Sequence, residues 1–304
     1  MLFRSVDDLR HAKAKTLMFS LDGTLRYLPL AALYDGERYL VEQYRLSVFT
    51  TASNARLKDR PSVSWKVAGF GVTKEHENAP ALPSVAAELA GIIHQEPRIG
   101  GVLEGEMLLD DNFTLTSMRD TLRKRYGVVH IASHFSFQPG NDANSFLLLG
   151  DGGHYSLTEL RNSTNMFDGV QLLTLSACNT GVGDAQGQGK EVEAFGALAQ
   201  KKGAKAVIAS LWPVADESTS LLMREFYRIR ETNPGMTKVE ALGQSQMKLL
   251  RGEVKAEPGA QRAMIQEAAS KKPLPKAPSF KAPTDAPSAH PYDWAPFFLM
   301  GNWL

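Results

Sequence analysis

The middle of this 304-residue chain alternates continuous apolar runs with amphipathic stretches. The apolar runs are rich in β-branched and aliphatic residues, which is typical of strands buried on both faces. These runs lie at 128–133, 172–177 and 204–211, and the stretches 64–72 and 101–109 are also typical of strands. The stretches between and after them predict helices at 83–95, 113–126, 216–231 and 237–251.

Buried strands that alternate with helices favour a parallel sheet that is covered by helices on both faces. We therefore expect an α/β fold with a mostly parallel sheet, whose core occupies residues 63–251. The chain is 43% hydrophobic and 22% charged, and it is long enough to bury such a core. This composition excludes disorder throughout the chain.

The first 62 residues follow a different pattern, in which turn signals separate short apolar runs. Two Asp-Gly pairs, Asp22-Gly23 and Asp35-Gly36, interrupt the runs between 16 and 50. Asp-Gly between apolar runs is a strong signal for a β-hairpin. We therefore expect residues 1–62 to form an N-terminal β-rich segment, with antiparallel hairpin strands packed on the core.

Composition changes abruptly after the last predicted helix. Residues 252–290 are dense in Pro, Lys and Ala, and such a stretch offers little apolar surface to offset the entropy of ordering it. We expect a mobile loop there. The closing residues 291–304 are rich in aromatic and aliphatic side chains, which predicts a C-terminal strand that returns to the core.

Charge and targeting signals narrow the range of partners. The net charge is only +1, so no strong uniform field would attract the chain to nucleic acid or to an anionic membrane. The N-terminus lacks the apolar core of a secretory signal, and no run approaches the ~20 apolar residues of a membrane span. We expect a soluble, cytoplasmic protein that binds neither nucleic acid nor membrane.

The chain contains a single cysteine, Cys178. An intrachain disulfide and a cysteine-based metal cage are therefore both excluded. The lack of disulfides fits a reducing compartment. The role of Cys178 must be sought in its own chemistry.

Cys178 and His134 each follow a predicted buried strand, and the carboxyl ends of such strands collect the active-site loops of open α/β sheets. If the two strands are adjacent, His134 lies beside the thiol. An imidazole raises the thiolate fraction of a neighbouring cysteine and can later protonate a leaving amine. Backbone N–H groups after the strand ends are suited to stabilise an oxyanion.

The spacing agrees with a known pattern. Caspases carry Gln-Ala-Cys-x-Gly with the catalytic histidine about 50 residues upstream. Here the corresponding sequence is SACNTG, residues 176–181, and His134 lies 44 residues before Cys178. The pattern therefore favours a cysteine peptidase in which Cys178 is the nucleophile and His134 the base.

His130 competes with His134 for the role of base. The two are four residues apart, about 13 Å along a strand, so only one of them can reach the thiol. His130 lies inside the apolar run VVHIA. We interpret His130 as a buried, neutral, structural histidine with a backbone partner.

Several longer stretches resemble the CHAT domain, a caspase-like peptidase module named for its association with HetF and tetratricopeptide repeats. The similarity covers nearly the whole chain outside the Pro-rich loop. It is carried by DGTLRYLPLAALYDGERYLVEQY, VVHIASHFSF, LLTLSACNTGVGD, AVIASLWPVADESTSLLMREFY and HPYDWAPFFLMGNW. The resemblance implies a caspase-like fold in a bacterial thiol protease, a hydrolase that cleaves peptide bonds with a Cys–His dyad and uses no metal or organic cofactor.

The chain departs from the family pattern after the histidine, where the family usually has glycine and this chain has Phe135. The resemblance assigns the oxyanion hole to the backbone N–H groups of this residue and Cys178. A Cβ at Phe135 restricts φ, so we expect a hole that is imperfect or that forms only on activation.

Substrate selection is expected from loops that flank the dyad. The resemblance points to Ser176 and to the segment 212–216, from Trp212 to Asp216, as lining of the pocket. Asp216 would favour a basic substrate side chain by charge, or it caps the helix 216–231. Trp212 lines the cleft or packs against the core.

Two functions remain open at this point. The first is a cysteine endopeptidase whose partners are a protein or peptide substrate and a regulatory element. The second is a catalytically silent caspase-like scaffold that binds proteins in the same cleft. Related proteins carry tetratricopeptide repeats before this module, so we expect the sensor to be a separate chain or a domain absent from this sequence.

Overall fold

The computed structural model of the protein describes residues 8–60, 64–77, 79–94, 101–138, 140–176, 190–212, 214–254 and 286–304. For residues 190–194 and 287 it describes the backbone alone. The predicted mobile loop 252–290 falls largely on 255–285, and Cys178 falls on 177–189, so both lie outside the described residues.

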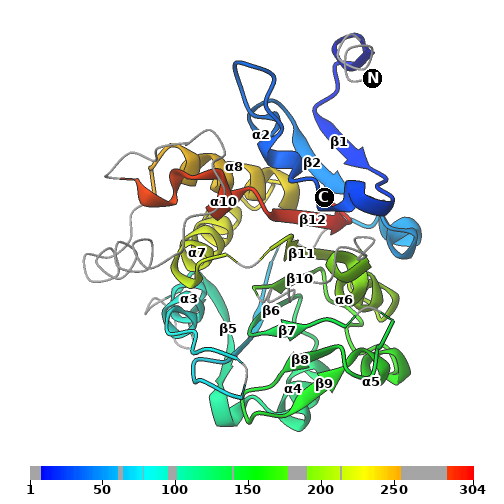
Figure 1. The fold of residues 1–304 in the computed structure, drawn as a ribbon, viewed down its shortest axis with the longest axis vertical. Coiled ribbons are helices and arrows are strands. Elements are labelled where there is room, and N and C mark those ends of the chain that lie inside the picture. Colours follow the sequence, from blue (N-terminus) through cyan, green and yellow to red (C-terminus); the bar gives the residue numbers. More distant parts are fainter. Residues whose placement is uncertain are drawn as a thin grey trace.

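A nine-stranded sheet forms the centre of the fold (Figure 1). The strands are β1 (Thr16–Phe19), β2 (Arg45–Val48), β3 (Val67–Gly71), β4 (Ile93–His94), β5 (Leu103–Leu109), β6 (Val128–Ala132), β10 (Leu172–Leu175), β11 (Ala206–Ser210) and β12 (Phe297–Gly301). Their order is β1-β2-β12-β11-β10-β6-β3-β5-β4, and neighbours are parallel except β11 and β12. The predicted α/β fold with a mostly parallel sheet is confirmed.

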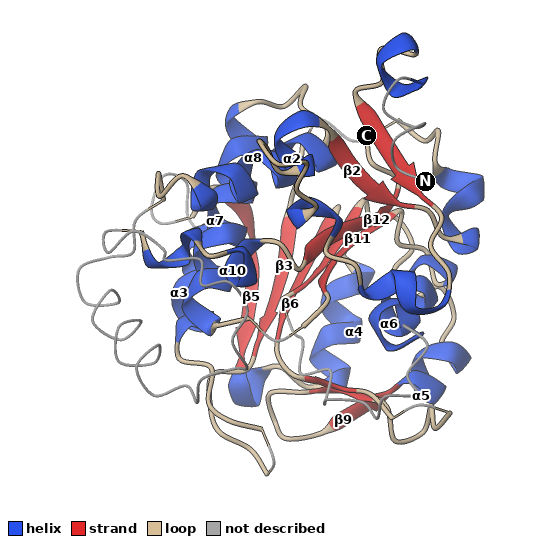
Figure 2. Ribbon diagram, turned by 45° about the horizontal axis from the view of Figure 1, so that its top comes forward, coloured by secondary structure: helices blue, strands red, loops and turns tan. Residues whose placement is uncertain are grey.

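Helices cover both faces of this sheet (Figure 2). One face carries α3 (Ser84–Ile92), α7 (Asp216–Thr232), α8 (Lys238–Leu250) and α10 (Pro291–Trp294). The other carries α4 (Leu115–Arg123), α5 (Leu157–Asn162) and α6 (Lys190–Lys201). Further helices are α2 (Leu40–Gln43), η1 (Gly23–Tyr27), η2 (Leu30–Ala32), η3 (Thr51–Arg56), η4 (Asp110–Asn112) and η5 (Pro287–Ala289).

The two helical layers explain the continuous apolar run of β6. Val129 and Ile131 pack into the core on the α4–α6 side, whereas Val128 and Ala132 pack into the core on the α3–α7 side. Both sets are fully buried, because successive side chains of a strand point to opposite faces. A strand in this position has no solvent-facing side.

A small antiparallel sheet follows β6 in the chain. It consists of β7 (Phe135–Ser136), β8 (Phe146–Leu148) and β9 (His154–Ser156), in that order. Ser156 and Glu159 form a reciprocal capping box that starts α5 directly after β9. Along the chain, the small sheet therefore links the end of β6 to α5.

The N-terminal strands pair differently from the prediction. β1 and β2 are parallel, with Thr16 opposite Arg45, so the expected antiparallel hairpin is wrong. The chain between them contains η1, η2 and α2, which make a crossover instead of a tight turn. At the first Asp-Gly pair, the Asp22 carboxylate accepts the amide hydrogen of Gly23 and caps η1.

The second Asp-Gly pair does make a tight turn. The Asp35 carboxylate accepts amide hydrogens from Glu37 and Arg38, and a single antiparallel bridge joins Tyr34 to Tyr39. The following residues enter α2 at once, so the turn is not extended into strands. The Asp35-Gly36 pair therefore correctly predicts a turn, but the hairpin strands expected on either side of it are reduced to a single bridge.

The C-terminal strand β12 joins the N-terminal segment to the rest of the sheet. It pairs antiparallel with β11, with Ala206 opposite Gly301, and parallel with β2, with Met300 opposite Val48. β1, β2 and β12 therefore run opposite to the other six strands. Among the described residues, no helix is long and apolar enough to cross a membrane.

A buried lysine fixes α8 to the end of the chain. The Lys238 ammonium group donates to the side-chain oxygen of Asn302 at 3.2 Å and to the carbonyl oxygen of Leu304. Burial, together with the nearby charges of Arg230 and Lys205, lowers the pKa of Lys238 to about 7. The surroundings therefore disfavour the protonated form of the Lys238 amine.

We expect Lys238→Met to change how stability depends on pH. The unfolded lysine has a pKa of about 10.4, so between pH 7 and 10 the unfolded chain binds more protons than the folded one. The wild-type free energy of unfolding should therefore rise from pH 7 to pH 9, and this rise should be smaller in Lys238→Met. Urea denaturation at both pH values measures it, with the exposed Lys66→Met as control. An equal rise in all three proteins would contradict the prediction.

Candidate functional site

His134 lies at the carboxyl edge of the central sheet, two residues beyond the end of β6. Its carbonyl oxygen accepts the amide hydrogen of Leu148 at 2.9 Å. The preceding residue, Ser133, donates its hydroxyl to the Leu148 carbonyl at 2.6 Å. The histidine backbone is thus held between the large sheet and the small sheet.

The imidazole of His134 has a defined backbone partner. Its Nε2 lies 2.8 Å from the carbonyl oxygen of Pro80. A carbonyl oxygen can only accept, so the hydrogen of the neutral ring is on Nε2 and the lone pair is on Nδ1. The free basic atom of His134 is therefore Nδ1.

The surroundings keep this imidazole neutral. Burial lowers the pKa of His134 below its usual value, the bond to the Pro80 carbonyl raises it, and the neighbouring His76 lowers it again. The net shift is downward. At neutral pH His134 is therefore in the form that can accept a proton.

The loop that supplies Pro80 connects β3 to α3. His76 and Ala79 exchange two backbone hydrogen bonds of 3.0 Å and form a tight turn. The start of the loop is fixed by Thr73, whose amide and hydroxyl donate to the Asp110 carboxylate at 2.7 and 2.6 Å. Pro80 contacts His134 through its backbone carbonyl, and His76 affects the pKa of His134 because it lies nearby. Neither role leaves a recognisable signal in the sequence.

Cys178 lies outside the described residues, but the strand that leads to it is described. β10 pairs in parallel with β6, with Leu175 opposite Ile131. The amide of Ser176 donates to the Ile131 carbonyl at 2.8 Å and continues this pairing. The predicted adjacency of the two strands is confirmed.

Two of the predicted pocket residues lie near this edge. Ser176 is partly buried, and its hydroxyl oxygen has no hydrogen-bond partner within the described part of the chain. Trp212 follows β11, donates its indole N–H to the Tyr292 carbonyl at 3.1 Å and stacks on the Tyr292 ring. Trp212 therefore packs on α10 and remains partly exposed.

Asp216 caps a helix, although not the predicted one. Its carboxylate accepts the amide hydrogen of Ser84 at 2.6 Å, at the first residue of α3. Its own helix α7 begins after Ala215 with no side-chain cap. The prediction that Asp216 caps the helix 216–231 is therefore wrong. The Asp216 carboxylate accepts instead from the start of α3, because the first amide groups of a helix have no acceptor within that helix.

Phe135 is a core residue in the small sheet. Its ring is buried and packs edge-to-face against Phe195 at 5.4 Å between centroids. Its backbone belongs to β7, an extended conformation that any residue adopts. The side chain of Phe135 therefore causes no backbone strain here.

His130 is fully buried, as predicted, but its partners are side chains. Its Nε2 lies 2.7 Å from Glu88 Oε1, and its Nδ1 lies 3.2 Å from the Tyr227 hydroxyl. The predicted backbone partner is wrong, because the carbonyl and amide of a central strand are used by its neighbours in the sheet.

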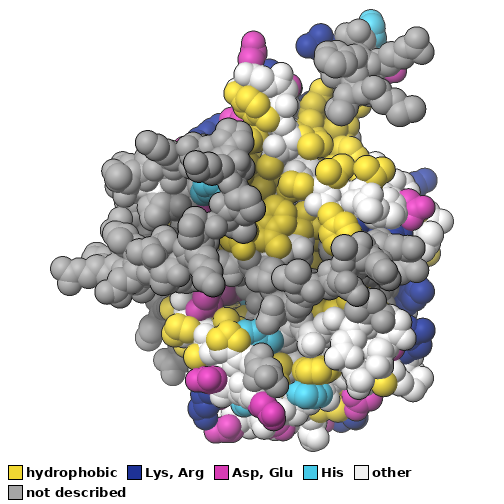
Figure 3. All heavy atoms as spheres, in the orientation of Figure 1, with side chains coloured by type: hydrophobic (Ala, Val, Ile, Leu, Met, Phe, Trp, Pro, Cys, Tyr) yellow, Lys and Arg dark blue, Asp and Glu magenta, His cyan; other side chains and the backbone are white. Residues whose placement is uncertain are grey.

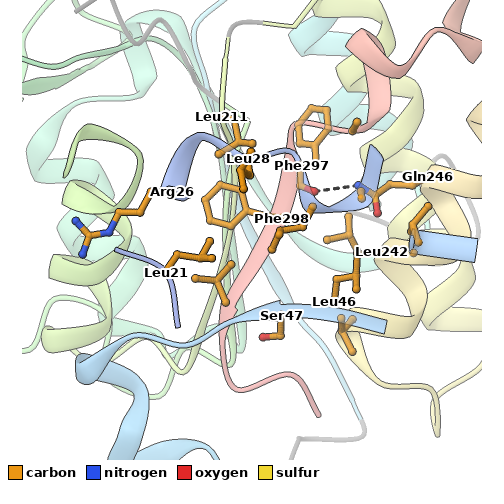
Figure 4. Close-up of a pocket in the computed structure, with 17 residues that line it drawn as sticks. Leu21, Arg26, Leu28, Leu46, Ser47, Leu211, Leu242, Gln246, Phe297 and Phe298 are labelled. Carbon is orange, nitrogen blue, oxygen red and sulfur yellow. Dashed lines mark hydrogen bonds between the residues drawn. The ribbon is translucent and has the colours of Figure 1, made fainter. Parts of the chain in front are cut away.

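An apolar pocket lies between β2, β12 and α8 and includes none of the predicted site residues (Figure 4). Leu46 of β2, Phe298 of β12 and Leu242 of α8 line it, together with Leu211. Figure 3 shows hydrophobic side chains gathered on the surface in this region. Across the described residues, no cluster of His, Cys, Asp and Glu is arranged to hold a metal ion.

Comparisons with known proteins agree with this architecture. The sequence model of the CHAT domain matches residues 1–302. A structure of the Saccharomyces cerevisiae separase–securin complex superimposes with a TM-score of 0.54 and 9% identity, over 92% of this chain and 15% of the matched chain. This likeness shows a shared caspase-like fold. The present chain thus spans a small part of that protein.

Two gingipain structures are more distant. The Arg-specific cysteine proteinase gingipain R matches with a TM-score of 0.43 and 12% identity, over 89% of this chain and 56% of that chain. The complex of the pro- and mature domains of Porphyromonas gingivalis RgpB gives 0.43 and 10%, over 86% and 56%. No curated protein sequence matches the chain.

We expect His76→Gln to raise the pKa of His134. The substitution removes the neighbouring imidazole that lowers this pKa, while the larger effect of burial stays. An NMR pH titration of the ring protons should therefore give a pKa above the wild-type value and still below 6.5. The exposed His154→Gln serves as control. An unchanged His134 pKa in His76→Gln would contradict the assigned cause.

Asp216 provides a second prediction, on stability. Asp216→Ala should lower the free energy of unfolding by about 1 kcal/mol, because the Ser84 amide loses its acceptor. Asp216→Asn should keep most of the stability, since an amide oxygen can still accept. Urea denaturation of both variants measures the difference. Equal losses in Ala and Asn would show that the charge, and not the cap, matters.

Proposed function

Because the chain belongs to the CHAT domain family, we propose that it is a cysteine endopeptidase in which Cys178 attacks the peptide bond and His134 is the base. The observation that carries this proposal is the bond between His134 Nε2 and the Pro80 carbonyl. It orients the ring and leaves Nδ1 free, which is what a general base requires.

The register of the two strands supports the dyad. Ile131 and Leu175 are opposite each other in β6 and β10. His134 follows the first by three residues, and Cys178 follows the second by three. Parallel strands lie about 4.8 Å apart, so equal advances from paired residues favour neighbouring side chains.

The reaction proceeds in two stages. The thiol proton moves to His134 Nδ1 as the Cys178 sulfur bonds to the carbonyl carbon of the substrate, and the oxygen becomes an oxyanion. When the C–N bond breaks, Nδ1 returns this proton to the leaving amine and a thioester remains. Water then attacks the thioester, with Nδ1 accepting its proton and giving it back to the thiolate.

The low pKa of His134 affects both proton transfers. A neutral imidazole is ready to accept the thiol proton at pH 7, and its protonated form is a stronger acid toward the leaving amine. We assign the oxyanion hole to the backbone N–H groups of Phe135 and Cys178. The extended backbone of Phe135 removes the objection that a side chain there would distort the hole.

We place Ser176 and Trp212 in the substrate pocket. The Ser176 hydroxyl has no partner in the part of the chain that is described, and the partly exposed Trp212 ring offers an apolar wall. Asp216 contributes less than its charge suggests, because one carboxylate oxygen is engaged by Ser84. Its share in a preference for basic residues is therefore secondary.

A catalytically silent scaffold that binds proteins in the same cleft remains the second candidate function. Phe135 was the sequence feature that favoured it, and the extended backbone at this residue weakens that argument. The partners in either case are a protein or peptide and a regulatory protein, for which a tetratricopeptide-repeat sensor is our proposal. We place the protein in the cytoplasm of a bacterial cell. The two functions differ in whether the protein cleaves a peptide bond of the bound partner or only binds this partner.

Peptide cleavage tests the proposal. The purified protein should cleave members of a diverse peptide library, with products mapped by mass spectrometry. Cys178→Ala should abolish cleavage, and His134→Ala should reduce it about 100-fold or more, because a positioned base contributes at least that factor. His154→Ala, an exposed histidine, is the matched control.

Alkylation provides a second measurement on the same proteins. Cys178 is the single cysteine, so iodoacetamide labels one site. Labelling should be slower in His134→Ala, because the thiolate fraction falls without the imidazole. Cleavage by Cys178→Ala would disprove the nucleophile. Wild-type protein that binds peptides without cleaving them would favour the scaffold.

A further inference from the structure

Four buried polar side chains form a hydrogen-bonded network between β6, β10, α3 and α7. They are Glu88 on α3, His130 on β6, Tyr227 on α7 and Thr174 on β10. None of them is more than 1% exposed. The distances are 2.7 Å from Glu88 to His130, 3.2 Å from His130 to Tyr227 and 2.7 Å from Tyr227 to Thr174.

One consistent arrangement of hydrogens gives each of the three contacts one donor and one acceptor. If Glu88 is a carboxylate, His130 donates from Nε2 and accepts at Nδ1 from the Tyr227 hydroxyl. The Tyr227 oxygen then accepts the hydroxyl hydrogen of Thr174. Burial raises the pKa of Tyr227, so this hydroxyl keeps the proton that the arrangement needs.

This hydrogen-bonded network connects the elements that lead to the proposed dyad. His130 lies on β6, four residues before His134, and Thr174 lies on β10, four residues before Cys178. Glu88 lies in the second turn of α3, which follows the Pro80 loop directly. Displacement of α3 from β6 would therefore move the Pro80 carbonyl away from the His134 ring.

A second contact prevents α3 from turning about this bond. The Asp216 carboxylate ties the first residue of α3 to the start of α7, and Tyr227 lies on the same helix α7. The α3 helix is thus held at two points, Ser84 and Glu88, about one turn apart. Two points limit how far the helix can shift or tilt relative to β6 and α7.

We propose that Glu88, His130, Tyr227 and Thr174 are positioning residues, which set the Pro80 carbonyl against His134 and hold the strands of the dyad together. The inference rests on the proposed function for the meaning of the dyad. Its physical content is the orientation of one imidazole ring, which can be measured without catalysis. The four residues touch no substrate and act through His134.

The direct test is the tautomer of His134, read from the ¹⁵N shifts of its ring nitrogens and assigned by loss of the signals in His134→Gln. The wild-type protein should hold the hydrogen on Nε2, with slow exchange. Tyr227→Phe should give a mixture of tautomers with faster exchange of this hydrogen. Tyr155→Phe is the matched control, because Tyr155 is equally buried and lies in the small sheet.

A kinetic readout accompanies the spectrum. Tyr227→Phe should lower kcat about 10- to 100-fold with little change in KM, because misplaced catalytic groups act on the reaction step more than on binding. Glu88→Gln keeps an acceptor for His130 and should lose less than Glu88→Ala. Thr174→Val, which removes one hydroxyl with little change of volume, replaces Tyr227→Phe if that variant does not fold.

The outcomes separate this inference from the proposed function. A pure Nε2–H tautomer in folded Tyr227→Phe or Thr174→Val, as in wild type, would overturn the inference whatever the activity. A mixed tautomer in these variants, together with a wild-type protein that cleaves nothing, would refute the peptidase and leave the positioning of His134 intact. A mixed tautomer in the Tyr155→Phe control as well would also overturn the inference.

Discussion

The central strand β6 has no water on either face, and this constraint decides what each of its residues can do. Apolar residues of β6 fill the two cores, and the one polar side chain between them, His130, is held by a carboxylate and a hydroxyl. Two residues beyond the strand, at His134, the same chain becomes partly exposed. The boundary of the core therefore separates a structural histidine from the proposed catalytic base within four positions.

Helices α3 and α7 extend this constraint to the loops. Each contributes a buried polar side chain to β6, and Asp216 joins their starting turns. In this view α3 sets the position of the Pro80 carbonyl, so the orientation of the His134 ring depends on contacts inside the core. A backbone carbonyl is well suited to this task, because it accepts a hydrogen bond and cannot exchange protons itself.

Much of the central fold could be predicted, because strands buried on both faces leave a continuous apolar run. The runs at 128–133, 172–177 and 204–211 each became a strand of the parallel sheet. The pairing of β1 with β2 could not be predicted in the same way. Asp-Gly reports local turn chemistry, whereas parallel pairing depends on a partner strand, β12, that lies some 250 residues away.

The candidate site was predictable only in part, for a related reason. The position of His134 after a buried run carried a signal, since strand ends collect functional residues. Its partner carried none, because the contact comes from the backbone of Pro80. Asp216 was recognisable as a helix cap from its residue type, but a pattern along the chain could not tell that the capped helix is α3.

The place of β12 in the sheet has a consequence for how the protein is made. Of the nine strands, β1 and β2 are synthesised before the others, but they reach the rest of the sheet only through β12, which is synthesised after the others. Until β12 has been made, β11 is an exposed sheet edge and the two earlier strands have no place in the sheet. Such long-range pairing slows folding, because the chain must close a large loop first. The nine-stranded sheet can therefore be completed only after all of its strands have been made.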